Sequence, residues 1–210
     1  MIAIIDYDAG NIKSVENAVK SLGKEAVLTA DPQIIVKADH VILPGVGAFG
    51  DAMRRLKDRN LTEVIRQVCE NGTPFLGICL GLQLLFETSE ESPGVSGLGI
   101  LKGRILRIPD QNGTLKIPEI GWNDLSYPDN GRKTAGRLFK DIPEHSYVYF
   151  VHSYYLQAQD PSIVTAETEY GVRIHAAVEK NNVFAVQFHP EKSEAVGLHM
   201  LKNFLEVEKC

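Results

Sequence analysis

The stretch Pro74-Phe75-Leu76-Gly77-Ile78-Cys79-Leu80-Gly81 reads as a buried strand, a tight turn with a cysteine at its tip, and the start of a helix. Gly77 and Gly81 stand two positions on either side of Cys79, where a strained strand-to-helix turn requires small residues. A thiol at the first turn of a helix is favoured as thiolate by the peptide dipoles. The pattern predicts a nucleophile elbow and acyl transfer through a thioester, with a buried structural cysteine as the alternative.

Around this elbow, short apolar runs alternate with amphipathic stretches in the first half of the chain, which predicts a parallel sheet covered by helices. The second half is strand after strand, closed by a helix over 193–207 with Ser193 as its cap. We expect one domain over residues 1–210 with an α/β fold: an open mixed sheet, mostly parallel in the centre with an antiparallel edge, and helices on both faces. The expected strands cover 2–7, 26–29, 40–43, 75–78, 98–108, 121–125, 146–158, 163–169 and 173–188, and the other expected helices cover 11–22 and 51–71.

Composition narrows the function classes. The 210 residues are 44% hydrophobic and 23% charged, which suits one globular core. A net charge of -5 without a long Lys/Arg run argues against nucleic acid, and no apolar stretch is long enough to span a membrane. The amino terminus lacks the pattern of a signal peptide, and the three cysteines match no metal or redox spacing. We expect a cytoplasmic protein with no metal and no cofactor.

A cysteine nucleophile needs a base, and the base needs a group that orients it. His189 is the strongest candidate of the six histidines because it follows the apolar strand Val183–Phe188, at the strand end where α/β sheets place their sites. Pro190 keeps the chain extended, so Glu191 is predicted beside His189 and can accept a hydrogen bond from its ring. Cys79, His189 and Glu191 form the predicted triad, against the alternative of a strand-capping histidine and a solvated glutamate.

An oxyanion hole requires two N–H donors near the nucleophile. The amide of Leu80 is one, because it follows the elbow residue. The second is expected from the glycine-rich segment Pro44-Gly45-Val46-Gly47, whose alternative is a plain turn. Residues 45–50 also match the dinucleotide fingerprint, but the next strand ends in Cys79 instead of an acid, which argues against a nucleotide cofactor.

With these pieces assembled, the chain resembles the class I, triad-type glutamine amidotransferases, and within them the family of glutaminase subunits of imidazole glycerol phosphate synthase. The resemblance runs from end to end, and its only departures, Asp8-Ala9 and Leu82, lie outside the predicted triad. The motifs that carry it are Asp6-Tyr7 with Gly10-Asn11 and Ser14-Val15, Pro44–Phe49, Gly77–Gln83, Gly121-Trp122-Asn123, Phe150–Tyr154 and Gln187–Ser193.

The resemblance implies a chemistry for each motif. Cys79 would attack the side-chain amide of glutamine, His189 would protonate the leaving ammonia and then activate water, and Glu191 would orient His189. Leu80, Val46 and Gly47 would hold the oxyanion. The implied glutamine-binding residues are Gly45, Gln83, His152, Ser153 and Tyr154.

The resemblance also implies a partner. Members of this family form a heterodimer with a (β/α)8-barrel cyclase, which uses the ammonia to make imidazole glycerol phosphate and AICAR in histidine biosynthesis. The docking face would include Asn11, Ser14, Trp122 and Asn123, and the Gly45–Gly47 segment is where partner activation would act. Three alternatives stay open: a glutaminase subunit of another pathway, a free-standing cysteine hydrolase, and an inactive regulatory subunit.

Overall fold

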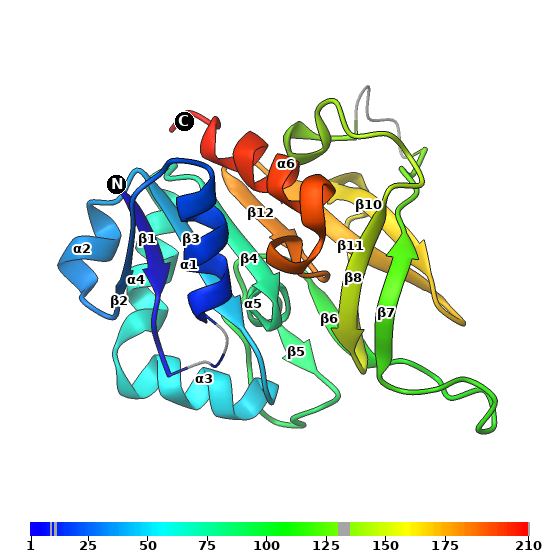
Figure 1. Cartoon of the computed structure of the whole chain (residues 1–210). Coiled ribbons are helices and arrows are strands. Elements are labelled where there is room, and N and C mark those ends of the chain that lie inside the picture. The colour runs from blue at the N-terminus through cyan, green and yellow to red at the C-terminus, as the bar shows by residue number, and fades with distance from the viewer. Residues whose placement is uncertain (9, 11, 130–134, 210) are drawn as a thin grey trace.

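A seven-stranded mixed sheet forms the centre of the computed structural model, which describes residues 1–8, 10, 12–129 and 135–209 (Figure 1). Five strands run parallel and two antiparallel strands form one edge, as the sequence predicts. The spatial order is β10 (Val164–Glu169), β11 (Arg173–Lys180), β12 (Val183–Val186), β4 (Phe75–Cys79), β3 (His40–Gly45), β1 (Ile2–Ile5) and β2 (Ala26–Thr29).

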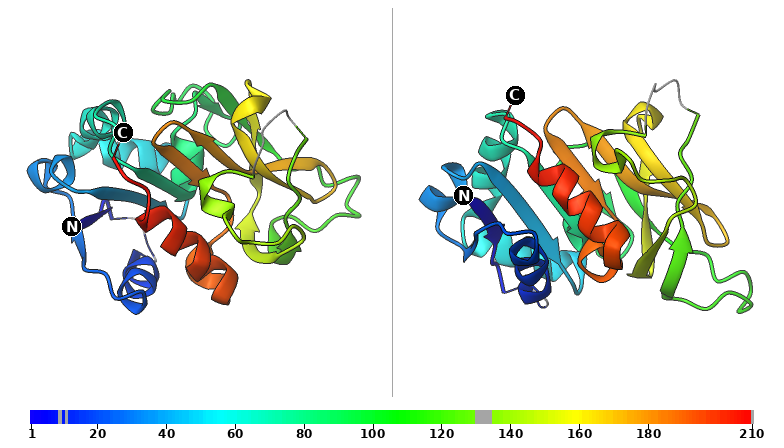
Figure 2. Two further views of the ribbon diagram at one scale, coloured as in Figure 1. Left: turned by 90° about the horizontal axis from the view of Figure 1, so that it is seen from above. Right: turned by 45° about the horizontal axis from the view of Figure 1, so that its top comes forward.

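Helices cover both faces of this sheet, as Figure 2 shows. On one face lie α1 (Ile12–Ser21) and α6 (Glu194–Leu205), and on the other lie α2 (Pro32–Val36), α3 (Phe49–Asp58) and α4 (Leu61–Glu70). Each face buries its own apolar core. In the α1–α6 core, Phe184 of β12 meets Phe204 of α6 edge to face at 5.8 Å. Burial of one such ring contributes about 1.5–3 kcal/mol.

Two smaller sheets flank the carboxyl ends of the parallel strands. One contains β5 (Thr88–Ser89), β6 (Gly103–Arg107) and β9 (Tyr154–Ala158). The other is an antiparallel pair of β7 (Glu119–Asp124) and β8 (Tyr147–His152), which stands beside α6 in Figure 1. The remaining elements are α5 (Leu80–Leu84) and the 3-10 turns η1 (Arg137–Phe139), η2 (Pro161–Ile163) and η3 (Pro190–Lys192).

Several element predictions were wrong in detail. The expected helix 51–71 is two helices, because Asn60 adopts a left-handed conformation with φ 56° between α3 and α4. The expected strands 146–158 and 173–188 each contain two strands separated by a turn. Helix α2, which the sequence analysis did not predict, begins after Asp31, whose side chain accepts from the Gln33 amide.

Ser193 is not the side-chain cap of α6. Its hydroxyl donates to the His189 carbonyl at 2.7 Å and accepts from the Tyr149 amide at 3.0 Å. The residue therefore ties the chain after β12 to β8, instead of satisfying the first amides of the helix. Within the described part of the chain, no helix is long and apolar enough to cross a membrane.

Candidate active site

The turn at Cys79 is a sharp, strained elbow between β4 and α5. Cys79 has φ 54° and ψ -108°, a backbone conformation that a non-glycine residue adopts only when its surroundings impose it. A Cβ on Gly81 would lie 1.9 Å from the Leu43 carbonyl oxygen, and one on Gly77 would lie 2.8 Å from the Gly81 oxygen. The two glycines are needed because the helix start, its own strand and β3 approach one another so closely.

His189 and Glu191 lie together at the end of β12. The His189 Nδ1 and the Glu191 Oε1 are 2.8 Å apart, and both side chains are almost fully buried. The local geometry differs from the prediction, because residues 190–192 form the 3-10 turn η3 and do not continue extended. The His189 amide donates to the Tyr149 carbonyl at 2.9 Å, so β8 helps to hold the imidazole in place.

The pKa of His189 is raised to about 9. Burial of the ring lowers this pKa, but the interactions of the charged ring with Cys79 and with Glu191, which is hydrogen-bonded to Nδ1, raise it by more. Because Nδ1 is hydrogen-bonded to Glu191, the buried Nε2 is the ring nitrogen that can interact with the nucleophile. A charged imidazole beside the sulfur is the arrangement that a thiolate nucleophile needs.

A pocket of about 290 Å³ opens over Cys79 at the carboxyl ends of β3, β4 and β12. This is the edge at which α/β sheets bind their ligands. The predicted nucleophile and base share it with most of the predicted oxyanion and substrate residues. Its lining consists of Val46, Gly47, Cys79, Leu80, Gln83, Glu91, Pro118, Val151, His152, Ser153, Tyr154 and His189.

The segment after β3 contributes the oxyanion candidates Val46 and Gly47, which line this pocket together with Leu80. Gly47 has φ 103°, a conformation that suits glycine. Gly45 pairs with Cys79 in the parallel ladder and is closely packed, since a Cβ on it would lie 2.4 Å from the Tyr7 hydroxyl and 3.0 Å from the Leu80 Cβ. Its predicted contact with substrate remains a prediction.

The predicted substrate residues on α5 and β8–β9 are joined by hydrogen bonds. Gln83 Nε2 donates to the Tyr154 carbonyl at 3.2 Å, and His152 Nδ1 donates to the same oxygen at 2.9 Å. The Nε2 of His152 lies 3.1 Å from Oε2 of the buried Glu119, which comes from β7. The wall of the pocket is therefore tied to the β7–β8 pair.

Glu91 is a pocket residue that the sequence analysis missed. Its Oε2 accepts from the Phe49 amide at 2.7 Å, and Ser92 accepts from the Gly50 amide at 3.0 Å. These contacts fill the amino terminus of α3, where a dinucleotide-binding loop would place a phosphate. Within the described residues, no three His, Cys, Asp or Glu side chains gather to hold a metal ion.

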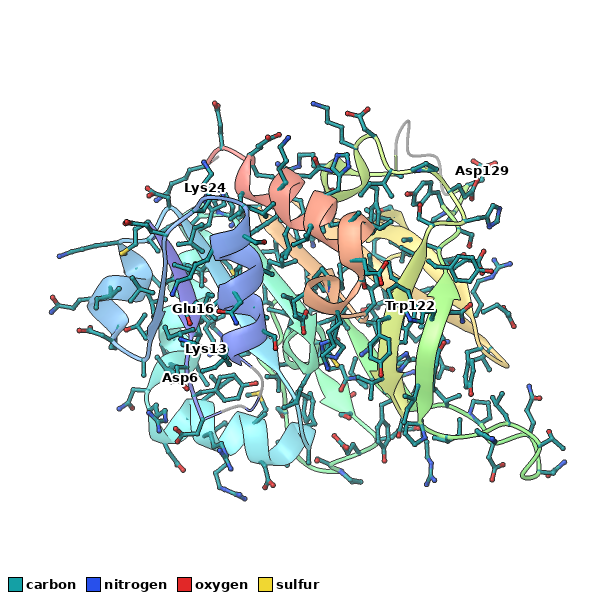
Figure 3. The ribbon with its side chains drawn as sticks, viewed as in Figure 1. Asp6, Lys13, Glu16, Lys24, Trp122 and Asp129 are labelled. Atoms are coloured by element: carbon teal, nitrogen blue, oxygen red, sulfur yellow. The ribbon has the colours of Figure 1, made fainter. Side chains whose placement is uncertain are left out.

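Within the described part of the chain, the predicted docking residues Ser14, Trp122 and Asn123 do not line the pocket. Trp122 is 47% exposed on β7, while Asn123 donates to Glu119 Oε1 at 2.9 Å and to the Glu169 carbonyl at 3.0 Å. Ser14 is half-buried on α1, and Asn11 lies outside the described residues. Figure 3 shows Trp122 over the β7–β8 pair on the side of the molecule that also carries α1.

Comparisons with known proteins identify the class to which this fold and site belong. A family model described as "Glutamine amidotransferase class-I" matches residues 3–207, so the chain belongs to that family. Among solved structures, a glutamine amidotransferase superposes with a TM-score of 0.73 at 20% identity, covering 97% of this chain and 99% of that chain. The PurLQS structure from Thermotoga maritima superposes with a TM-score of 0.70 at 24% identity, covering 97% of this chain and 96% of that chain. At these identities, both similarities show the fold alone.

Curated relatives narrow the family further. The chain is 48% identical over 207 residues to imidazole glycerol phosphate synthase subunit HisH of Methanothermobacter thermautotrophicus, covering 99% of this chain and 98% of the relative. It is 49% identical over 206 residues to the subunit of the same name from Moorella thermoacetica, covering 98% of this chain and 94% of the relative. Within the class, the chain thus falls in the HisH family of imidazole glycerol phosphate synthase subunits.

Proposed function

We propose that this protein is the glutaminase subunit of an imidazole glycerol phosphate synthase and that residues 1–210 form one glutamine amidotransferase domain. It hydrolyses glutamine to glutamate and ammonia and passes the ammonia to a (β/α)8-barrel cyclase. The observation that carries the proposal is the buried Cys79, His189 and Glu191 set at one pocket, in a chain that is 46–50% identical to HisH relatives over nearly its whole length.

The first half of the reaction forms a thioester. The Cys79 sulfur attacks the side-chain amide carbon of glutamine, and the resulting oxyanion accepts hydrogen bonds from the Leu80 amide and from an amide of Val46 or Gly47. As the C–N bond breaks, the charged His189 gives its proton to the leaving nitrogen, which departs as ammonia. A pKa of about 9 keeps this proton on the ring at neutral pH.

The second half consumes water. His189, now neutral, takes a proton from a water molecule that attacks the thioester carbon, and the C–S bond breaks to release glutamate. Glu191 accepts the hydrogen bond from Nδ1 and stabilises the charge that returns to the ring. The Cys79 sulfur leaves as a thiolate, so the site regains its starting state.

The pocket also has groups for the α-amino and α-carboxylate ends of glutamine. The carboxylate of Glu91 faces the pocket and suits an ammonium group. Because Gln83 uses its Nε2 within the chain, its Oε1 is the atom left to accept from a substrate ammonium. Backbone groups of residues 152–154 on the opposite wall suit the carboxylate end.

The β7–β8 pair supplies the docking face. Ile120, Trp122 and Tyr147 are exposed apolar side chains on these two strands, 62%, 47% and 58% accessible. Trp122 packs edge to face on Tyr149, whose ring also carries the Lys192 ammonium at 5.7 Å. A rigid aromatic group of this kind is suited to anchor a protein partner. Because Val151 of the same pair lines the pocket, docking there would reach the site directly.

The test is glutamate release from glutamine by the protein alone, with a barrel cyclase, and with the cyclase and its ligand. We expect weak release alone, a steep rise with the liganded cyclase, and loss of both in Cys79→Ala. Strong release alone would make the protein a free-standing hydrolase. Absence of release in every condition, with cyclase binding demonstrated, would leave a regulatory subunit.

A further inference from the structure

Gln187 is a buried amide beside the nucleophile, and the chemistry above gives it no role. It follows β12, has no exposed surface, and donates its backbone N–H to the Ala176 carbonyl at 2.8 Å. Its side-chain Nε2 lies 3.7 Å from the Cys79 sulfur, close enough for an N–H···S hydrogen bond. The side chain therefore contacts the atom that attacks the substrate.

A second buried amide, Gln83, sets the orientation of Gln187. Gln83 Nε2 donates to the Tyr154 carbonyl at 3.2 Å and to Gln187 Oε1 at 3.1 Å. Because a backbone carbonyl only accepts, Gln83 must turn its nitrogen toward Tyr154 and hence toward Gln187. The oxygen of Gln187 faces Gln83, so its NH₂ group faces the sulfur.

The other neighbours of the Cys79 sulfur show why a hydrogen-bond donor beside it would stabilise the thiolate. The Val151 carbonyl oxygen lies 4.0 Å from Sγ, and its partial negative charge disfavours a thiolate. An N–H group that meets the sulfur favours the charged form. The positive charge of the His189 ring also favours the thiolate, and Gln187 provides an N–H donor that stays in place when His189 gives up its proton.

We infer that Gln187 is a further catalytic residue, which donates a hydrogen bond to the Cys79 thiolate, and that Gln83 is its positioning residue. The inference rests on the proposed glutaminase function. During thioester hydrolysis the C–S bond breaks and its electron pair stays on sulfur, while the proton of the attacking water goes to His189. Gln187 neither gains nor loses a proton, and its N–H group stabilises the thiolate that leaves while His189 holds the proton taken from the water.

The test is the pH dependence of Cys79 alkylation by iodoacetamide in the protein without cyclase or glutamine. In Gln187→Met we expect the pH of half-maximal rate to rise by about one unit and the rate at pH 7 to fall about tenfold, since a hydrogen bond to a charged group is lost. Gln187→Glu should raise that pH further. The matched control Gln157→Met, an exposed glutamine on β9, should leave the profile unchanged.

The remaining titratable groups near the sulfur are His189 and Tyr7, with Glu91 and His152 on the pocket wall. All four are present in every variant, so they do not account for a difference between Gln187→Met and the control. An unchanged alkylation profile in a folded Gln187→Met protein would overturn the inference. Because this assay uses neither glutamine nor cyclase, its result is independent of the outcome for the proposed function.

A measurement on the unaltered protein covers the case in which Gln187→Met does not fold. The side-chain amide resonances of Gln187, followed by NMR across pH, should shift with the same midpoint as Cys79 alkylation. Gln187 resonances that do not respond to ionisation of the thiol would contradict a hydrogen bond to the thiolate.

Discussion

At the scale of single residues, the charge of His189 is set by the groups on its two sides. Glu191 and Cys79 raise the pKa of the ring to about 9 although burial lowers it. A group whose pKa is raised on folding contributes stability that is fully present below its unfolded value near 6.5. That contribution is lost as pH rises through about 9. In the proposed mechanism, this is the proton that the leaving ammonia would receive.

Glutaminase activity with the liganded cyclase should therefore fall as pH rises through about 9, because His189 loses the proton that it must donate. In Glu191→Gln the fall should begin at lower pH, since a neutral amide no longer raises the pKa of the ring. The measurement is kcat/KM against pH. Glu63→Gln, an exposed carboxylate on α4, is the control. A fall at the same pH in Glu191→Gln and the unaltered protein would contradict this account.

The residues that sequence reasoning found and missed differ in how far apart they lie along the chain. Cys79 stands between two glycines and His189 stands two residues from Glu191, so local spacing reveals them. Gln187 lies 108 positions from the sulfur that it contacts. Glu91 reaches the pocket from a loop whose polar residues also suit a solvated turn. Only the folded structure brings these two side chains to the site.

At the scale of elements, the site depends on how closely α5 approaches β3. The short helix begins directly at the strained Cys79, and Gly81 lies against the Leu43 carbonyl. The alternation of apolar runs and helices predicts the parallel strands that create this arrangement. It did not predict the break at Asn60, because both sides of the break carry the same helical periodicity.

Gly81→Ala should destabilise the protein by at least about 2 kcal/mol, because the added methyl would force apart the backbones of α5 and β3. Denaturant unfolding measures the difference. Gly10→Ala is the control, since among the described residues the nearest atom to its Cβ would be a side-chain methyl of Val46, at 3.2 Å, and not a backbone atom. Equal unfolding free energies for Gly81→Ala and the unaltered protein would show that the elbow is not as tightly packed as described.

At the scale of the whole molecule, the pocket and the β7–β8 pair form one side of the chain. The pair contributes Val151 and His152 to the pocket wall and exposes Trp122 outside it. The sequence resemblance located this strand pair through its motifs. It could not show that Glu119 and His152 join the two regions, since that contact depends on the register of β7 against β8.

Trp122→Ala should weaken binding of the barrel cyclase by about 30-fold, corresponding to about 2 kcal/mol for an aromatic anchor. Titration calorimetry measures the affinity. Because Trp122 is exposed, the thermal unfolding temperature should change little. Val27→Ala, an exposed apolar residue on the edge strand β2, should bind normally. Cyclase binding that is equally tight for both variants would place the docking face elsewhere.

The central claim is that Cys79 is the nucleophile that attacks glutamine. The most direct measurement uses a glutamine analogue with a chloroketone in place of the amide, followed by mass spectrometry of the peptides. We predict a single adduct on Cys79, formed more slowly when glutamine is present in excess, and none on Cys69, whose burial raises its pKa to about 12. Labelling of another residue, together with glutamate release that survives in Cys79→Ala, would contradict the account.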